Sequence, residues 1–147
     1  MKRIYYSYDT FREDLILLTQ KIDFEFDAIL AIARGGLTMA HLLGEHYDIR
    51  EVYAVNTIGY DDTKKRDSIE VFNLPDLKGA RSVLIVDDIV DSGDTMVALL
   101  EKLHTRYPDV TFKAASLFYK KSAKIMPDWS IKEANAWIDF FWTEDLR

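Results

Sequence analysis

The stretch VLIVDDIVDSGDT, residues 83–95, decides the fold class of this chain. It begins inside a largely apolar segment, Arg81 to Val86, that has the length of a strand. Two acids, an apolar pair and a loop of small polar residues follow, and the loop opens a helix. An apolar strand without polar alternation is typical of a parallel sheet covered on both faces. Strand, loop and helix in this order indicate an α/β protein.

The same stretch carries the elements of a phosphate site. Asp87 and Asp88 are adjacent at the predicted end of the strand, so their side chains are expected on opposite sides of the pleat, one for sugar hydroxyls and one for a metal or a structural partner. The loop Asp91 to Thr95 exposes backbone N–H groups at a helix N-terminus, which favours an anion. Ser92 and Thr95 add hydroxyl donors. A turn with a helix cap would explain the loop alone, but the complete string favours a binding site.

The rest of the chain repeats the alternation of strand and helix. Tyr8 to Lys21 has helical periodicity, with Asp9 or Thr10 as the expected N-cap. Its predicted buried face consists of Phe11, Leu15, Leu18 and Ile22. Further strands are predicted at Phe26–Ala33, Glu51–Ile58 and Val110–Phe118, and further helices run from Gly36 through Leu43 and from the central loop to Leu103. Ligands of such sheets bind beyond the carboxyl ends of the strands, at a topological switch point.

The composition narrows the classes of function. The chain has 147 residues, 48% hydrophobic and 30% charged, which predicts one globular domain over residues 1–147. Its net charge of −6 argues against a nucleic-acid partner. Cysteine is absent, so disulfides and thiolate chemistry are excluded. Neither a signal peptide nor an apolar run of about 20 residues is present, and we expect a cytoplasmic protein without an integral membrane segment.

The central string resembles the signature of type I phosphoribosyltransferases, which bind phosphoribosyl pyrophosphate (PRPP). The resemblance implies an α/β fold whose central, mostly parallel sheet is flanked by helices, with a small C-terminal hood over the base site. It assigns the loop to the 5-phosphate, and Asp87 and Asp88 to the ribose hydroxyls. Asp88 is the favoured metal ligand, and which of the two acids binds the metal directly stays open. Asp91 is the implied general acid/base near purine N7. The implied PRPP contacts of this string are Asp87, Asp88, Ile89, Val90, Asp91, Ser92, Gly93, Asp94 and Thr95.

Two further segments are similar to parts of the PRPP site. After the first long strand, Arg34 and Gly35 combine a cation with a backbone that a pyrophosphate can approach. The resemblance implies a cis peptide at Ala33-Arg34. The polar segment from Ile58 to Ile69 corresponds to the lid that closes over PRPP, with Arg66 as its phosphate contact. Gly59-Tyr60 stands where many relatives have Ser-Tyr, so a serine role is left open there.

The base-binding residues come from the second half of the chain. Lys120 follows a strand and is the implied donor to purine O6, although a slip of one position to Lys121 stays open. Trp137 is the implied stacking residue, with Ile89 on the opposite face of the base. Ile138 is assigned to the base edge. The aromatic tail, Phe140-Phe141-Trp142, is expected to pack on the core or on another subunit.

The chain resembles the bacterial xanthine-guanine branch of the family, and this resemblance implies a purine salvage enzyme. It would transfer ribose-5-phosphate from PRPP to guanine, xanthine or hypoxanthine with Mg2+, as a homodimer or homotetramer. Alternatives are an enzyme for another base and a non-catalytic PRPP-binding regulator. A receiver domain is excluded because its acid pair follows the first strand, whereas the pair in this chain comes past the middle. A P-loop NTPase is excluded because the sequence contains no G-x-x-x-x-G-K-[ST] motif. His41, His46 and His104 show no metal-binding spacing.

Overall fold

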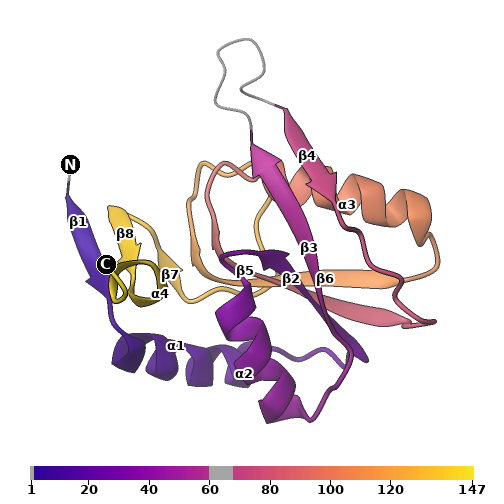
Figure 1. Ribbon diagram of the computed structural model, residues 1–147, viewed down its shortest axis with the longest axis horizontal. Coiled ribbons are helices and arrows are strands. Elements are labelled where there is room, and N and C mark those ends of the chain that lie inside the picture. Colours follow the sequence, from indigo (N-terminus) through magenta and orange to yellow (C-terminus); the bar gives the residue numbers. More distant parts are fainter. Residues whose placement is uncertain (1, 60–67) are drawn as a thin grey trace.

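A computed structural model describes residues 2–59 and 68–147. Its main sheet has six strands in the order β4-β3-β2-β5-β6-β7, and β1 and β8 form a separate two-stranded sheet (Figure 1). Within the main sheet the strands run parallel, apart from β4, which is antiparallel to β3. The strands are β1 (Arg3–Tyr6), β2 (Ala28–Ala33), β3 (Val52–Gly59), β4 (Ile69–Phe72), β5 (Ser82–Val90), β6 (Thr111–Tyr119), β7 (Lys132–Glu133) and β8 (Trp137–Phe140). This is the mostly parallel sheet that the sequence predicts.

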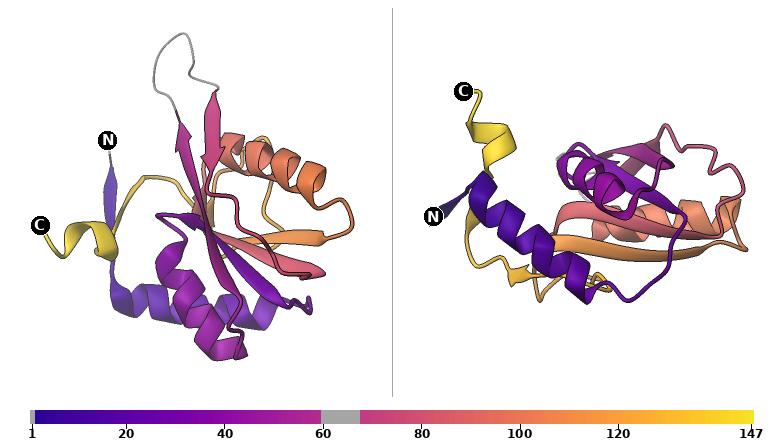
Figure 2. Two further views of the ribbon diagram at one scale, coloured as in Figure 1. Left: turned by 45° about the vertical axis from the view of Figure 1, so that its right-hand side comes forward. Right: turned by 90° about the horizontal axis from the view of Figure 1, so that it is seen from below.

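The apolar strands are buried because helices cover both faces of the sheet. In β2, Ile29 and Ala31 belong to one core cluster, and Leu30 and Ile32 belong to the other. The first cluster contains the buried faces of α1 (Tyr8–Lys21) and α2 (Leu37–Tyr47), and the second contains that of α3 (Asp94–Arg106). Figure 2 shows α1 and α2 on the opposite side of the sheet from α3. Successive side chains of a strand therefore belong to alternate cores, one on each face of the sheet. This explains why the central strands are largely apolar.

Helix α1 has the predicted bounds, but its predicted N-cap is wrong. Ser7 is the N-cap, with extended backbone, and its hydroxyl accepts a hydrogen bond from the Thr10 N–H at 3.1 Å. Asp9 and Thr10 instead lie in the first turn, where an acid is favourable near the helix dipole. The predicted face is confirmed: Phe11, Leu15 and Leu18 are buried, and Ile22 packs on the same cluster.

The observed boundaries of several other elements differ from the predicted ones. Strand β5 continues through Asp87 and Asp88 to Val90, because Ile89 and Val90 pair with Phe118 and Tyr119 of β6. The twin acids therefore lie inside the strand. Strand β2 starts at Ala28 rather than Phe26, and α2 and α3 each run past their predicted ends. Strands β1, β4, β7 and β8 were not predicted; they are short, with two to four residues each.

The two ends of the chain form the hood. Strand β1 pairs in parallel with β8, in register from Arg3 opposite Trp137 to Tyr6 opposite Phe140. The short helix α4 (Phe141–Glu144) follows β8 directly, and both views show it beside β1 (Figures 1 and 2). Phe141 and Trp142 contact the ring of Phe11 at 5.5 and 5.4 Å between centroids. The aromatic tail thus packs on the core, as one of the two expected alternatives.

The chain order creates a switch point between β2 and β5. After β2 the chain forms β3 on one side of it, and then β5 on the other. Loops leaving the carboxyl ends of β2 and β5 therefore diverge from adjacent strands, which leaves a crevice at that edge.

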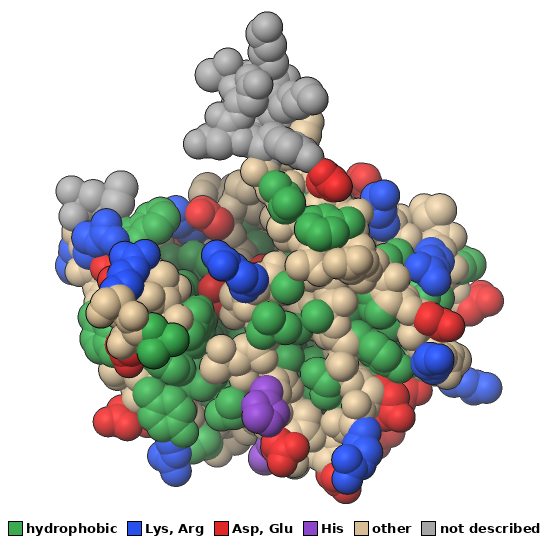
Figure 3. Space-filling view, in the orientation of Figure 1, with side chains coloured by type: hydrophobic (Ala, Val, Ile, Leu, Met, Phe, Trp, Pro, Cys, Tyr) green, Lys and Arg blue, Asp and Glu red, His purple; other side chains and the backbone are tan. Residues whose placement is uncertain are grey.

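Among the described residues no helix is long and apolar enough to cross a membrane. Acidic and basic side chains are interspersed over the described part of the face in Figure 3.

Candidate active site

The loop after β2 meets the acids of β5 at the switch point. A Cβ on Gly35 would lie 2.4–2.6 Å from the carboxyl atoms of Asp88, so only glycine allows this approach. The Ala33-Arg34 peptide is cis, as the resemblance implies. Arg34, Gly35 and Asp88 line a cavity of about 520 Å³. Trp142 and Thr143 of the hood complete its walls. The loop therefore provides an open space bounded by one guanidinium and one carboxylate.

The carboxyl groups of Asp87 and Asp88 have raised pKa values. Burial raises the pKa of Asp87 well above the ordinary value for a carboxyl, and the charge of Asp88 raises it further. Burial also raises the pKa of Asp88. Both line a second cavity, at the loop Asp91 to Thr95, called the phosphate loop below. In the described chain only Asp88 of the two also borders the first cavity, called the Arg34 cavity below. Although neighbours in a strand, the two carboxyls remain close enough to interact. A cation or hydroxyl donors beside them would lower the cost of ionisation.

The phosphate loop encloses a cavity of about 230 Å³. Gly93 has φ +86°, in the left-handed region, and caps helix α3. This turn directs the loop around the cavity and leaves backbone N–H groups at the helix start. Most of the predicted PRPP contacts come together here: Asp87, Asp88, Ile89, Val90, Asp91, Ser92, Gly93 and Thr95 line the cavity, with Met96.

Asp94 is the exception among the predicted contacts of this loop. It does not line the cavity. Its backbone N–H donates to the Ser92 hydroxyl at 3.1 Å, and its carboxylate forms an ion pair with Lys124 at 2.6 Å. The side-chain hydrogen bond from Lys124 lowers the pKa of Asp94 below its ordinary value. The carboxylate of Asp94 is therefore occupied outside the loop.

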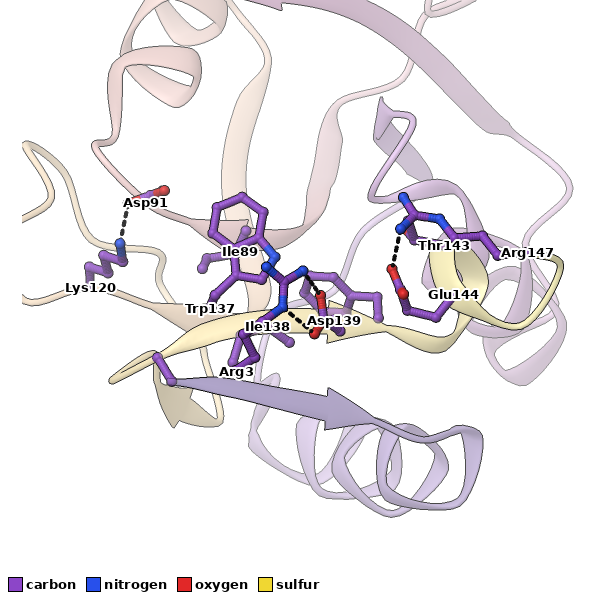
Figure 4. A pocket seen from close by; sticks show the side chains of 12 residues that line it. Arg3, Ile89, Asp91, Lys120, Trp137, Ile138, Asp139, Thr143, Glu144 and Arg147 are labelled. Carbon is purple, nitrogen blue, oxygen red and sulfur yellow. Dashed lines mark hydrogen bonds and ion pairs between the residues drawn. The ribbon is translucent and has the colours of Figure 1, made fainter. Parts of the chain in front are cut away.

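A third cavity, of about 270 Å³, lies between β5 and the hood (Figure 4). Ile89, Asp91, Lys120, Trp137 and Ile138 all line it. The ammonium of Lys120 is 3.0 Å from a carboxylate oxygen of Asp91. These residues come from β5 and its loop, from the end of β6 and from β8, so they are brought together only by the fold. All the predicted base-binding residues thus share one cavity.

Lys120 and Lys121, the two candidate lysines, lie in different places. Lys121 lines none of the cavities described above, and its side chain is 76% exposed. It pairs with Glu133 at 3.6 Å. Lys120 is the lysine that faces the cavity and Asp91. Arg66 and Tyr60, with the lid prediction, lie outside the described residues.

Several lining residues were missed by the sequence reasoning. Arg3 makes two hydrogen bonds to the Asp139 carboxylate, at 2.7 and 3.0 Å, and its guanidinium lies 5.8 Å from the centre of the Trp137 ring (Figure 4). Thr143 borders both the base cavity and the Arg34 cavity. Arg3 and Asp139 are 136 positions apart, so no local pattern could have joined them. The remaining missed residues are Met96, Ala136, Phe140, Trp142, Glu144 and Arg147.

The donor set suits a magnesium ion bound largely through its substrate. The described residues contain no cluster of three or more His, Asp or Glu side chains that would enclose a metal. Two carboxyls with raised pKa values border the cavities, and their mutual repulsion would be relieved by a cation. Mg2+ commonly takes one or two carboxylates together with substrate phosphates and water. The residues therefore fit a substrate-bridged ion and not a closed protein cage.

The three cavities share lining residues. Asp88 borders the first two cavities, and Ile89 and Asp91 border the last two. Residues 9–147 match the family described as the phosphoribosyl transferase domain. The chain belongs to this family. Its fold is that of the type I phosphoribosyltransferases.

Particular phosphoribosyltransferases resemble this chain over most of its length. The xanthine-guanine-hypoxanthine phosphoribosyltransferase of Helicobacter pylori is 42% identical, with a TM-score of 0.91 over 99% of this chain and 96% of that chain. A purine phosphoribosyltransferase of Pyrococcus horikoshii is 26% identical, with a TM-score of 0.83 over 98% and 96% of the two chains. The xanthine-guanine phosphoribosyltransferase of Cereibacter sphaeroides is 32% identical over 99% of this chain and 90% of its own. The resemblance to the bacterial purine branch is therefore confirmed.

Proposed function

We propose that this phosphoribosyltransferase is a purine salvage enzyme. It transfers ribose-5-phosphate from PRPP to a 6-oxopurine, which is guanine, xanthine or hypoxanthine, and releases pyrophosphate. The observation that carries the proposal is the Lys120–Asp91 pair, 3.0 Å apart, in a cavity that also contains Trp137. The purine enzymes that resemble the chain over nearly its full length support the same substrate class.

The base cavity suits a flat heterocycle with a carbonyl group. Trp137 is 54% exposed, and Ile89 lines the same cavity. Lys120 donates to O6 of the base, and Ile138 contributes backbone groups to the base edge. Adenine carries an amino group at that position, so a donor would face a donor. A donor that the bound base covers and leaves unpaired rejects such an analogue strongly.

PRPP occupies the other two cavities. The N–H groups and hydroxyls of the loop from Asp91 to Thr95 bind the 5-phosphate, and Asp87 and Asp88 accept hydrogen bonds from the ribose hydroxyls. Arg34 and the backbone at Gly35 bind the pyrophosphate group. Arg66, outside the described residues, contributes a cation from the proposed lid. Neighbouring cavities share lining residues, which supports the placement of one extended substrate.

Asp88 would hold Mg2+ together with oxygens of the substrate. When bound, Mg2+ neutralises the charge that develops on the departing pyrophosphate. The protein forms no covalent intermediate and acts by positioning and electrostatics. The bond from ribose C1 to pyrophosphate oxygen breaks, pyrophosphate keeps the electron pair, and purine N9 bonds to C1 with inversion. Asp91 accepts the proton that the purine loses, and Lys120 holds O6 during the transfer.

The decisive experiment offers guanine, xanthine, hypoxanthine, adenine and uracil in turn to the protein with PRPP and Mg2+. Nucleotide formation with one or more 6-oxopurines, abolished by chelation of the metal, is the expected result. PRPP binding without turnover of any base would instead identify a regulator. Turnover of adenine or uracil alone would preserve the PRPP site and overturn the roles of Lys120 and Trp137.

Three further properties belong to this proposal. We expect the chain to act as a homodimer or homotetramer in the cytoplasm, with residues 1–147 as one catalytic domain. Light scattering of the purified protein checks the assembly. A monomer with full activity would contradict the expected oligomer and leave the reaction unchanged.

A further inference from the structure

The phosphate loop is attached along its length to the loop that follows β6. The Lys120 N–H donates to the Val90 carbonyl at 3.0 Å, and the Lys124 N–H donates to the Ser92 carbonyl at 2.8 Å. A Cβ on Gly93 would lie 2.9 Å from the Lys124 nitrogen, so the two backbones are in close contact. The segment 120–124 thus supports the segment 90–93 from outside.

Two ion pairs connect the same segments. Lys120 pairs with Asp91 at 3.0 Å, and Lys124 pairs with Asp94 at 2.6 Å. The first pair lies in the base cavity. The second belongs to no cavity described above, and the Asp94 side chain is only 19% exposed. The second pair therefore needs an explanation other than contact with the base.

An acid at position 94 is unfavourable for the proposed ligand. Asp94 is the first residue of α3 and stands between two residues of the phosphate cavity, Gly93 and Thr95. A phosphate group there carries up to two negative charges, and a nearby carboxylate would repel it. An acid in a first turn also interacts favourably with its helix dipole, but this effect is present with or without Lys124. Lys124 is the described cation that compensates the carboxylate.

We propose that Lys124 is a positioning residue for the 5-phosphate of PRPP: it holds the Asp94 carboxylate outside the phosphate loop and cancels its charge. This inference rests on the proposed function. Lys124 does not border the cavity and acts through Asp94. Removal of the lysine leaves an uncompensated carboxylate beside the bound phosphate, whereas removal of both charges restores a neutral surrounding.

The test is a double-mutant cycle on the full chain. Dissociation constants for PRPP with Mg2+, and separately for ribose 5-phosphate, are measured by calorimetry for wild type, Lys124→Met, Asp94→Asn and the double variant. Lys124→Met is expected to weaken both ligands about tenfold, and the double variant is expected to return within about threefold of wild type. The loss should shrink at high salt, because the repulsion is screened.

Lys121→Met is the matched control, since it removes a neighbouring lysine that pairs with Glu133. It is expected to bind both ligands like wild type. Lys124→Arg, which keeps the charge, should do the same. Thermal unfolding of each variant shows whether it folds, and Lys124→Gln replaces Lys124→Met if that variant does not.

Two results would overturn the inference. Unchanged affinity in Lys124→Met would show that Asp94 does not affect the phosphate. A double variant as weak as Lys124→Met would show that Lys124 acts through packing or direct contact. If the wild-type protein binds ribose 5-phosphate but turns over no purine, only the proposed reaction is refuted. The double-mutant cycle would then still decide the role of Lys124. Binding of neither ligand would refute both.

Discussion

The ammonium group of Lys120 lies 3.0 Å from a carboxylate oxygen of Asp91 in the base cavity. A 6-oxopurine presents O6 and N7 side by side on one edge. A donor and a carboxylate at this separation match that edge, and in the free enzyme they satisfy each other. The base must therefore replace or bridge an existing ion pair. Both side chains are substantially exposed, at 41% and 63%, so this rearrangement requires little energy.

Replacement of Lys120 by Met is expected to reduce kcat/KM for 6-oxopurines about a hundredfold, because the donor to O6 is lost. The KM for PRPP should change less than about threefold. Activity with adenine should fall less than activity with guanine, which is measured in parallel assays. Lys121→Met serves as the control and should behave like wild type. A larger effect at Lys121 than at Lys120 would reverse the assignment.

Asp91→Asn is expected to lower kcat by a factor of about 100 to 1,000, since a positioned general base contributes this order of magnitude. The amide keeps the shape but cannot accept the purine proton. Binding of PRPP, measured by calorimetry, should stay within about threefold. Equal losses in turnover and in PRPP affinity would indicate a binding role in place of proton transfer.

Arg3→Met tests whether the N-terminal strand positions the stacking residue. Arg3 joins Asp139 by two hydrogen bonds and lies 5.8 Å from the Trp137 ring centre. Its removal should raise the KM for the purine about fivefold with little change in kcat, because the ring loses its support. Asp139→Asn should have a similar effect, and the two changes together should not add. Arg12→Met, on the exposed side of α1, is the control.

Replacement of Asp87 should stabilise the folded protein by an amount that depends on pH. The folded-state pKa of Asp87 is raised, so its stabilising contribution is complete below the ordinary carboxyl pKa of about 4 and is lost as pH rises through the raised value. Asp87→Asn should therefore increase Tm by about 3 °C at pH 8, in the absence of Mg2+ and PRPP, and hardly at pH 4. The Asn carbonyl can still accept the hydrogen bond that Asp87 receives from the Asp88 N–H at 2.8 Å. Thermal scans across pH check this, and a gain that is equal at both pH values would contradict the ionic cause.

Local patterns were sufficient for most of the framework. The amphipathic spacing over Tyr8–Lys21 predicts α1 with its observed bounds. Largely apolar runs predict β2, β5 and β6, because consecutive residues in the middle of each strand are buried. The short strands β1, β4, β7 and β8 escaped prediction, since two to four residues contain no resolvable period and depend on a distant partner.

The sequence by itself determined the phosphoribosyltransferase framework and the phosphate loop, because strand, acids, glycine and helix start are contiguous and their chemistry is local. Only the tertiary structure decided which distant side chains meet. It joined Arg3 to Asp139, and Lys124 to Asp94 across a loop that follows another strand. It also placed Thr143 between two cavities. Such contacts depend on strand pairing and loop packing between segments far apart in the chain, and no spacing along the sequence encodes them.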